Sequence, residues 1–264
     1  MSRPIVIEGP AASGLTLDCR GGALGVAGRA VTADRPTVLI RSSAEGRPSD
    51  VSLVDCRVYG AVRIWGLGAG GDYARLRTAS RRPDFTAAAQ AAAPTRVRLE
   101  RVRITANGTI PLYVGPGVTH TRLTQSVLDG RSDATAVYLD AESASNELID
   151  NDIRTRTTRE LIAVDGSADN RIEGNRFELN GRPGVLLYRN CGERGVIRHQ
   201  TPSRNRIVGN VFRGAGWWRP RLVVENARQG RRSYCGEDAG YPFGSSADDR
   251  DAGRDNVIEG NVRR

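Results

Sequence analysis

Tyrosine, aspartate and asparagine residues recur at a spacing near 25 residues, in types that could bind a sugar or a metal ion. They lie in short apolar runs that align with one another: PLYVG (111–115), AVYLD (136–140), IAVDG (162–166), LLYRN (186–190) and VVEN (223–226). Period-2 alternation predicts that the aliphatic residues point inward: Leu112, Val114, Val137, Leu139, Ile162 and Val164. The outward residues then form two columns: Tyr113, Tyr138, Ala163, Tyr188 and Val224, beside Gly115, Asp140, Asp165, Asn190 and Asn226.

These two columns favour a polysaccharide-binding surface. Aromatic faces can stack on sugar rings, and carboxylate and amide groups can bond hydroxyls or hold a cation. Asp140 and Asp165 on neighbouring coils would repel, which raises the pKa of one carboxyl unless a cation neutralises both. We therefore predict a Ca²⁺ site at Asp140, Asp165 and Glu142, and substrate contacts at Tyr113, Tyr138, Asn190, Glu193 and Asn226. The alternative is that these are ordinary polar residues where strands meet turns.

An eight-residue motif recurs along the same part of the chain. Its copies begin at Asn146, Asn170, Asn205 and Asn256, with a weaker copy at Thr121. A period of 24 to 25 residues predicts a solenoid in which each copy is one coil. Short alternating runs broken by Asn or Gly indicate strands and tight turns. We expect the Asn at each bend, Asn151, Asn175 and Asn210, to adopt the left-handed backbone and to hydrogen-bond its neighbours.

The "NxIxxNxF" register over residues 95–263 resembles the right-handed parallel β-helix of the pectate-lyase-like superfamily, with NosD-type repeats. The resemblance implies an all-β fold, a single-stranded right-handed parallel β-helix solenoid forming one domain over residues 1–264. It is specific for the fold and carries no assigned activity.

Three segments interrupt the repeat at 67–94, 191–204 and 227–255. The first contains FTAAAQAAA, which predicts a short helix ended by Pro94. The other two begin at the edge of the Tyr and Asp columns, so we expect them to wall a groove. Cys191 and Cys235 lie in twin contexts, RNCGE and SYCGE, which favours a disulfide between these loops over two free thiols. Cys19 and Cys56 are expected to be buried, stacked small residues.

Composition limits the partners. The 264 residues carry a formal charge of +9 from 39 basic residues, all of them Arg, scattered among 30 acidic residues. This pattern argues against a nucleic-acid stripe, although an anionic polysaccharide would still be attracted. No run is long enough for a membrane span and no signal peptide is visible, so we expect either a secreted or periplasmic protein whose export signal lies elsewhere, or a cytoplasmic one. The oligomeric state stays open.

The resemblance implies two kinds of enzyme. In a polysaccharide lyase or uronate epimerase, Ca²⁺ would neutralise the substrate carboxylate while a base removes the adjacent proton; the candidates are Arg189, His199, Arg198 and Tyr188. In a glycoside hydrolase of the polygalacturonase type, Asp140 and Asp165 would be acid and base. Carboxyls on adjacent coils lie closer together than an inverting pair requires. The NTD, GHG and RIK motifs of that family are also missing. A non-catalytic polysaccharide-binding or structural β-helix, such as a surface or tail-spike protein, is the third possibility.

Overall fold

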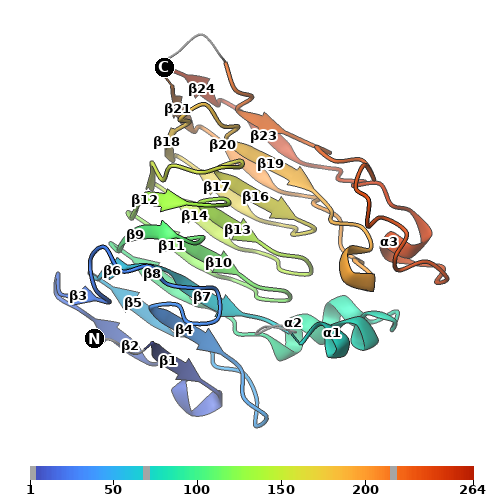
Figure 1. Cartoon of the computed structure of the whole chain (residues 1–264), viewed down its shortest axis with the longest axis horizontal. Helices are drawn as coiled ribbons and strands as arrows, with labels where there is room; N and C mark the ends of the chain where they lie inside the picture. The colour runs from blue at the N-terminus through green and yellow to red at the C-terminus, as the bar shows by residue number, and fades with distance from the viewer. Residues whose placement is uncertain (1–3, 68–71, 215–218) are drawn as a thin grey trace.

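The computed structural model describes residues 4–67, 72–214 and 219–264. In these residues the chain winds through three parallel sheets, A, B and C, of eight strands each, so that each coil supplies one strand to every sheet. Figure 1 shows the coils stacked from the N-terminus to the C-terminus along one axis.

The strands are short, and those of one sheet succeed one another at intervals of one coil. Sheet A contains β1 (Ile5–Glu8), β4 (Val38–Arg41), β7 (Val62–Trp65), β10 (Leu112–Val114), β13 (Val137–Leu139), β16 (Ile162–Asp165), β19 (Val185–Tyr188) and β22 (Val223–Val224). Sheet B contains β2 (Thr16–Asp18), β5 (Ser52–Val54), β8 (Arg98–Glu100), β11 (Arg122–Thr124), β14 (Glu147–Ile149), β17 (Arg171–Glu173), β20 (Arg206–Val208) and β23 (Val257–Glu259). Sheet C contains β3 (Ala23–Leu24), β6 (Arg57–Tyr59), β9 (Arg103–Gly108), β12 (Val127–Ser132), β15 (Asp152–Ile153), β18 (Arg176–Glu178), β21 (Val211–Arg213) and β24 (Val262–Arg263).

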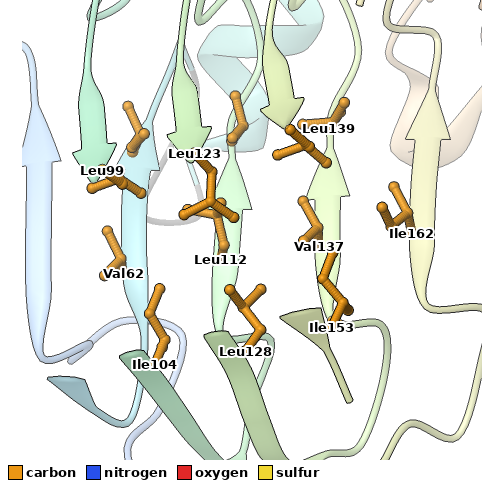
Figure 2. Close-up of a cluster of buried hydrophobic side chains, with 14 of the residues drawn as sticks. Val62, Leu99, Ile104, Leu112, Leu123, Leu128, Val137, Leu139, Ile153 and Ile162 are labelled. Carbon is orange, nitrogen blue, oxygen red and sulfur yellow. The ribbon is translucent and has the colours of Figure 1, made fainter. Parts of the chain in front are cut away.

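Aliphatic side chains from the three sheets meet inside each coil and form one continuous core (Figure 2). The sequence-predicted inward residues are all fully buried: Leu112, Val114, Val137, Leu139, Ile162 and Val164. Burial of each such side chain stabilises the fold by about 1.5–3 kcal/mol. Strand alternation therefore places the intervening residues of sheet A on its outer face.

Two ladders of buried asparagine side chains join successive coils. The first contains Asn146, Asn170, Asn205 and Asn256, and the second contains Asn151, Asn175, Asn210 and Asn261. In each step the side-chain oxygen of one Asn accepts both the backbone N–H and the side-chain N–H of the Asn one coil earlier, as Asn175 Oδ1 does from Asn151 at 3.0 Å and 3.0 Å. The predicted hydrogen-bonded stacking is confirmed.

The predicted left-handed backbone at these asparagines is wrong by one residue. Positive φ angles occur at the residue before each Asn, for example 56° at Asp150, 66° at Gly174 and 65° at Gly209. The preceding residue makes the bend at the surface, and this lets the Asn turn its side chain inward to satisfy buried backbone donors.

All three insertions leave the solenoid between sheet A and sheet B. The first, after β7, contains α1 (Tyr73–Ser80) and α2 (Phe85–Ala92), of which α2 was predicted and α1 was not. The second, after β19, contains the short 3-10 helix η3 (Glu193–Gly195), and the third, after β22, contains α3 (Gly244–Ala247). Figure 1 shows α1, α2 and α3 on the same side of the stack; a further turn, η1 (Pro10–Ala12), lies in the first coil.

Two disulfides are present. Cys191–Cys235 links the second and third insertions, which confirms the sequence-based prediction. Cys19–Cys56 joins the first two coils, a bond that was not predicted from the sequence; Cys56 is buried as expected, whereas Cys19 is only partly buried. Consecutive coils bring the ends of similar segments within bonding reach, with 4.8 Å between the two Cα atoms.

None of the helices in the described ranges is both long and apolar enough to cross a lipid bilayer.

Candidate functional site

A pocket of about 250 Å³ lies over the outer face of sheet A. Its floor is one register column that runs across three coils, because Arg63 of β7 pairs with Tyr113 of β10 and Tyr113 pairs with Tyr138 of β13. The inward neighbours of these residues are buried in the core, which holds the three outward side chains in place. The Arg63 guanidinium lies over the Tyr113 ring at 4.8 Å from its centroid.

The walls of this pocket, which we call the Asp140 pocket, come from segments far apart in the sequence. Asp34 belongs to the loop before β4, and Tyr73 and Leu76 belong to α1. The second insertion contributes its walls from η3 and the residues after it: Glu193, Arg194 and Arg198.

Asp140 is held between a phenol and a guanidinium. Tyr113 donates its hydroxyl hydrogen to Asp140 Oδ2, the backbone N–H of Ala141 donates to Oδ1 at 2.8 Å, and Arg198 Nη1 lies 3.6 Å from Oδ1. Burial raises the pKa of Asp140 to about 6, against the attraction of Arg198 and with a further contribution from the Asp165 carboxyl. Burial and the neighbouring Asp140 carboxyl raise the pKa of Tyr113 well above its ordinary value. The pair therefore combines a carboxylate of unusual basicity with a phenol that stays protonated.

Three arginines line this pocket, Arg63, Arg194 and Arg198. Arg198 spans two carboxyls, since its Nη2 lies 3.6 Å from Glu193 Oε2; although burial opposes it, the carboxylates raise the pKa of Arg198. Arg63 has no ion pair among the described residues, and its Nη2 donates to Thr109 Oγ1 at 3.0 Å. Arg63 as a whole is only 7% exposed, and burial lowers the pKa of Arg63.

Asp165 is closed off beside this pocket. Its Oδ2 accepts from the Tyr138 hydroxyl at 2.6 Å and from Asn190 Nδ2 at 2.7 Å, and its Oδ1 accepts from the Asn190 backbone at 2.8 Å. Tyr234, from the third insertion, donates to Asn190 Oδ1 at 2.8 Å. Asp165 is fully buried, so its carboxyl is satisfied by the protein and does not face the pocket.

The predicted column position of Tyr188 is wrong. Ala163 pairs with Leu186, and Asp165 pairs with Tyr188. The step from Ile162 to its partner Val185 is 23 residues instead of 25, so the strand slips by two positions and both of its outward residues change register. Tyr188 is fully buried, and its hydroxyl donates to Glu160 Oε1 at 2.9 Å.

Several other predicted site residues lie within the walls. Arg189 donates to the backbone carbonyls of Arg198, Asp248 and Arg250, which fastens the second and third insertions together. Asn226 is bonded to the backbone of Gly253. Neither side chain lines the pocket, and the catalytic role predicted for Arg189 finds no support in this geometry.

His199 lies at the junction of all three insertions. Its ring packs against Phe85 of α2 and Phe243 beside α3, with ring centroids 5.5 Å and 5.0 Å away, and its Nε2 is 2.7 Å from the Ser80 carbonyl oxygen. Glu142 lies beneath it and accepts from the His199 backbone at 2.8 Å and from Thr86 Oγ1 at 2.5 Å. These contacts point to a structural role for both residues.

The predicted calcium ligands fit a Ca²⁺ ion poorly. Within the described part of the chain, Asp140, Asp165 and Glu142 do not converge on one point: Asp165 is enclosed by Tyr138 and Asn190, and Glu142 faces the insertions. Arg198 already places a cation beside Asp140. A Ca²⁺ ion needs six or more oxygen ligands, and this donor set does not supply them.

Several pocket residues were not predicted from the sequence, among them Arg63, Trp65 and Tyr73. Arg63 was detectable, because it is the alternate residue of the AVRIWG run and continues the Tyr113 column by one coil. Tyr73 gave no repeat signal, since it belongs to an insertion. Trp65 follows the same alternation as Arg63.

Comparison with known proteins identifies the fold. The family described as "Right handed beta helix region" matches residues 46–219. Among solved structures, the Dettilon tailspike protein (gp208) is 13% identical over 100% of this chain and 54% of its own, with a TM-score of 0.33. A mutant of the periplasmic alginate epimerase AlgG is 12% identical over 85% of this chain and 67% of its own, with a TM-score of 0.32.

The chain thus spans about half the length of the tailspike that it matches. No curated protein matches the sequence. The family match covers well over half of the 264 residues, and the described strands form the stacked parallel coils that such a repeat predicts. The chain belongs to the right-handed β-helix family.

Proposed function

We propose that this protein acts on an acidic polysaccharide, as a lyase or an epimerase of uronate residues, with the reaction centred on Asp140. The observation that carries the proposal is the Asp140 carboxyl, which lines a pocket, has a pKa raised to about 6, and contacts both Tyr113 and Arg198. A general base works best when its pKa is near the working pH.

Arg63 supports an acidic substrate. It has no ion pair among the described residues, it lines the same pocket as Asp140, and it is in register with Tyr113. A guanidinium in this position can pair with a substrate carboxylate through two parallel hydrogen bonds. That pairing would also stabilise the negative charge that develops when the adjacent C–H bond breaks.

The proposed reaction uses the Asp140 and Tyr113 pair. Asp140 removes the proton beside the uronate carboxylate; in a lyase the electrons form a carbon–carbon double bond while the glycosidic C–O bond breaks. The departing oxygen takes the phenol proton of Tyr113, and the proton on Asp140 then returns to Tyr113 through their hydrogen bond. In an epimerase the C–O bond stays intact, the proton on Asp140 is released to solvent, and a solvent proton is delivered to the same carbon from the opposite face.

Glycoside hydrolysis is a second candidate, because two carboxyls of the pocket, Asp140 and Glu193, lie on the same guanidinium. Here Asp140 would be the acid and Glu193 the base or nucleophile. This pairing replaces the predicted Asp140 and Asp165 pair, since Asp165 is buried and satisfied. Non-catalytic polysaccharide binding is the remaining alternative.

The two disulfides support an oxidising compartment, so we place the working protein outside the cytoplasm, secreted or periplasmic.

The deciding experiment incubates the protein with uronate polysaccharides, with Ca²⁺ or with chelator, and follows ultraviolet absorbance of unsaturated uronate, release of reducing ends, and exchange of C5 hydrogen with deuterated solvent. Absorbance supports a lyase, exchange without absorbance supports an epimerase, and reducing ends without absorbance support a hydrolase. Asp140→Asn should abolish whichever signal appears, whereas Glu193→Gln should abolish it only in a hydrolase.

Silence of all three signals across the panel would contradict the enzymatic proposal. From the poor fit of the donor set, we expect chelator to leave the rate unchanged. A rate that depends on Ca²⁺ would restore the calcium hypothesis.

A further inference from the structure

Trp65 lies between the Asp140 pocket and a second, larger pocket over the first coils. The second pocket, which we call the N-terminal pocket, has a volume of about 690 Å³ and is lined by residues that include Glu8, Arg41, Arg47, Trp65, Asp72 and Arg75. Trp65 lines both pockets. Its register partner is Arg41, and the alternation of β7 turns its half-exposed indole outward while Ile64 is buried.

The N-terminal pocket has an excess of positive charge. Arg41 is paired with Glu8 at 3.0 Å, but neither Arg47 nor Arg75 has an ion pair among the described residues. Arg47 donates to the Gln90 carbonyl at 2.5 Å, and Arg75 is an exposed side chain of α1. Asp72 accepts from the Arg75 backbone at 3.0 Å as the cap of α1, so its carboxylate already has a partner. Two guanidinium groups that have no carboxylate partner among the described residues can therefore pair with a ligand carboxylate in this pocket.

The sheet face is covered on the other side of Asp140. The Arg228 guanidinium lies 3.6 Å from the centroid of the Tyr188 ring, and Tyr234 is bonded to Asn190. Both Arg228 and Tyr234 belong to the third insertion, which the Cys191–Cys235 disulfide fixes to the second. Asp165 and Tyr188 are fully buried beneath these contacts. A chain bound at Asp140 meets this barrier in one direction and Trp65 in the other.

We propose that an acidic oligosaccharide binds with one chain end in the Asp140 pocket and continues over Trp65 into the N-terminal pocket, so that the protein acts at chain ends. This inference rests on the proposed function, because it takes the Asp140 pocket as the reaction site. It adds a direction and a second binding subsite. The indole offers a flat apolar face for a sugar ring, and Arg47 and Arg75 offer partners for uronate carboxylates further along the chain.

The test measures binding of oligouronates of two to five residues, from pectin and from alginate, to the Asp140→Asn variant by calorimetry. We expect affinity to rise with length up to four residues. Trp65→Ala should lower the tetramer affinity about tenfold and the dimer affinity less, because Trp65 also lines the Asp140 pocket. Trp65→Phe should retain most of the affinity for both.

Arg75→Ala should weaken tetramer binding and lower its salt dependence. Arg77→Ala is the matched control, because Arg77 is an exposed arginine of the same helix that lines neither pocket. An increase of affinity with length that survives Trp65→Ala and Arg75→Ala would overturn the direction that we propose. The same is true of equal affinity for dimer and tetramer. Absence of binding by every oligouronate would instead contradict the proposed function itself.

The unmodified protein provides a second readout that does not depend on the Asp140→Asn variant. If it cleaves a polyuronate, one- and two-residue products should accumulate from the start while the viscosity of the solution falls slowly. A rapid loss of viscosity with long early products would show cleavage within the chain, which the covered face at Tyr188 does not allow.

Discussion

At the scale of single residues, the Asp140 carboxyl opposes folding when it is ionised. Its pKa in the folded protein is about 6, compared with about 4 in an unfolded chain, because burial disfavours the charge. The folded state therefore holds this proton to higher pH than the unfolded state does. Ionisation between pH 4 and 6 lowers the free energy of unfolding, and the full penalty is present above pH 6.

Asp140→Asn should stabilise the protein at neutral pH. The uncharged amide can accept from the Ala141 backbone through its oxygen and donate to the Tyr113 hydroxyl through its nitrogen, and Arg198 keeps Glu193 as a carboxylate partner. We expect the free energy of unfolding to rise by about 1 to 3 kcal/mol at pH 7.5 and to change little at pH 4. Guanidinium denaturation at the two pH values measures this. Asp133→Asn, at an exposed site, is the control, and an equal effect at both pH values would contradict the account.

The pH dependence of catalysis should follow the same carboxyl. As the base, Asp140 must be ionised, so kcat/KM should rise as the pH rises through about 6. Tyr113→Phe removes a hydrogen bond that lowers the pKa of Asp140, so the midpoint of the residual activity should move to higher pH. Tyr138→Phe is the matched variant, because its hydroxyl contacts Asp165 instead, and it should leave the midpoint unchanged. A midpoint that Tyr113→Phe does not move would remove Asp140 from the role of base.

The sequence predicted part of this site. Period-2 alternation at steps of 25 residues correctly brought Tyr113 and Tyr138 together, since no residue is gained or lost between their coils. It failed at Tyr188, because a shorter turn removes two residues from that coil. The pairing of Arg198 with Asp140 was not predictable from the repeat, because the path of an insertion depends on tertiary contacts such as those of His199 with Phe85 and Phe243.

At the scale of the elements, the asparagine ladders provide hydrogen bonds between neighbouring coils that longer strands would otherwise make. Most strands have only two to four residues, which leaves many backbone donors at the bends, and each ladder asparagine accepts one of them. The motif predicted the ladder at the bends, Asn151, Asn175 and Asn210, but not the second ladder formed by the first Asn of each copy. Thr121 and Ser126 take the two positions in the weaker copy. The exact residue that bends was not evident, because Asp, Gly and Asn all tolerate positive φ.

Asn175→Ala should destabilise the solenoid strongly. It leaves the backbone and side-chain donors of Asn151 without an acceptor in a buried place, at a cost of about 3 kcal/mol in the free energy of unfolding. Asn261→Ala is the matched control, because this asparagine is the last of its ladder and is partly exposed, so we expect about 1 kcal/mol. Urea denaturation compares the two variants, and equal losses would contradict the role of burial.

At the scale of the whole molecule, the three insertions behave as one wall. Leu76, Phe85 and Ala89 of the first pack against Val196 of the second, and Arg189 binds the backbone of the third. This assembly places Arg194, Arg198 and Tyr73 around the Asp140 pocket. The stacking of coils and the core residues of sheet A followed from the repeat, and a wall from the second and third insertions was expected from the sequence. The contribution of the first insertion and the contacts among the three required the tertiary structure.

Loss of the Cys191–Cys235 bond should loosen that wall without unfolding the coils. In the Cys191→Ser, Cys235→Ser variant, we expect faster amide exchange in residues 227–255 and a higher KM for polysaccharide, with little change in β10 to β17. The Cys19→Ser, Cys56→Ser variant is the control and should affect only the first coils. Unchanged exchange in 227–255 would show that packing alone holds the wall.

The position of the three insertions bears on how such a protein can change over evolutionary time. All three leave the solenoid after strands of sheet A and return before strands of sheet B. The ladder asparagines Asn205 and Asn256 directly follow the second and third insertions and still bond their neighbours one coil earlier, so the ladder and the core tolerate these loops. A new loop between sheets A and B can alter the pocket without disturbing the contacts between coils. Descendants of one scaffold can therefore diverge in substrate while they keep the repeat by which they are recognised as kin, so the residues that reveal ancestry are largely separate from those that select a ligand.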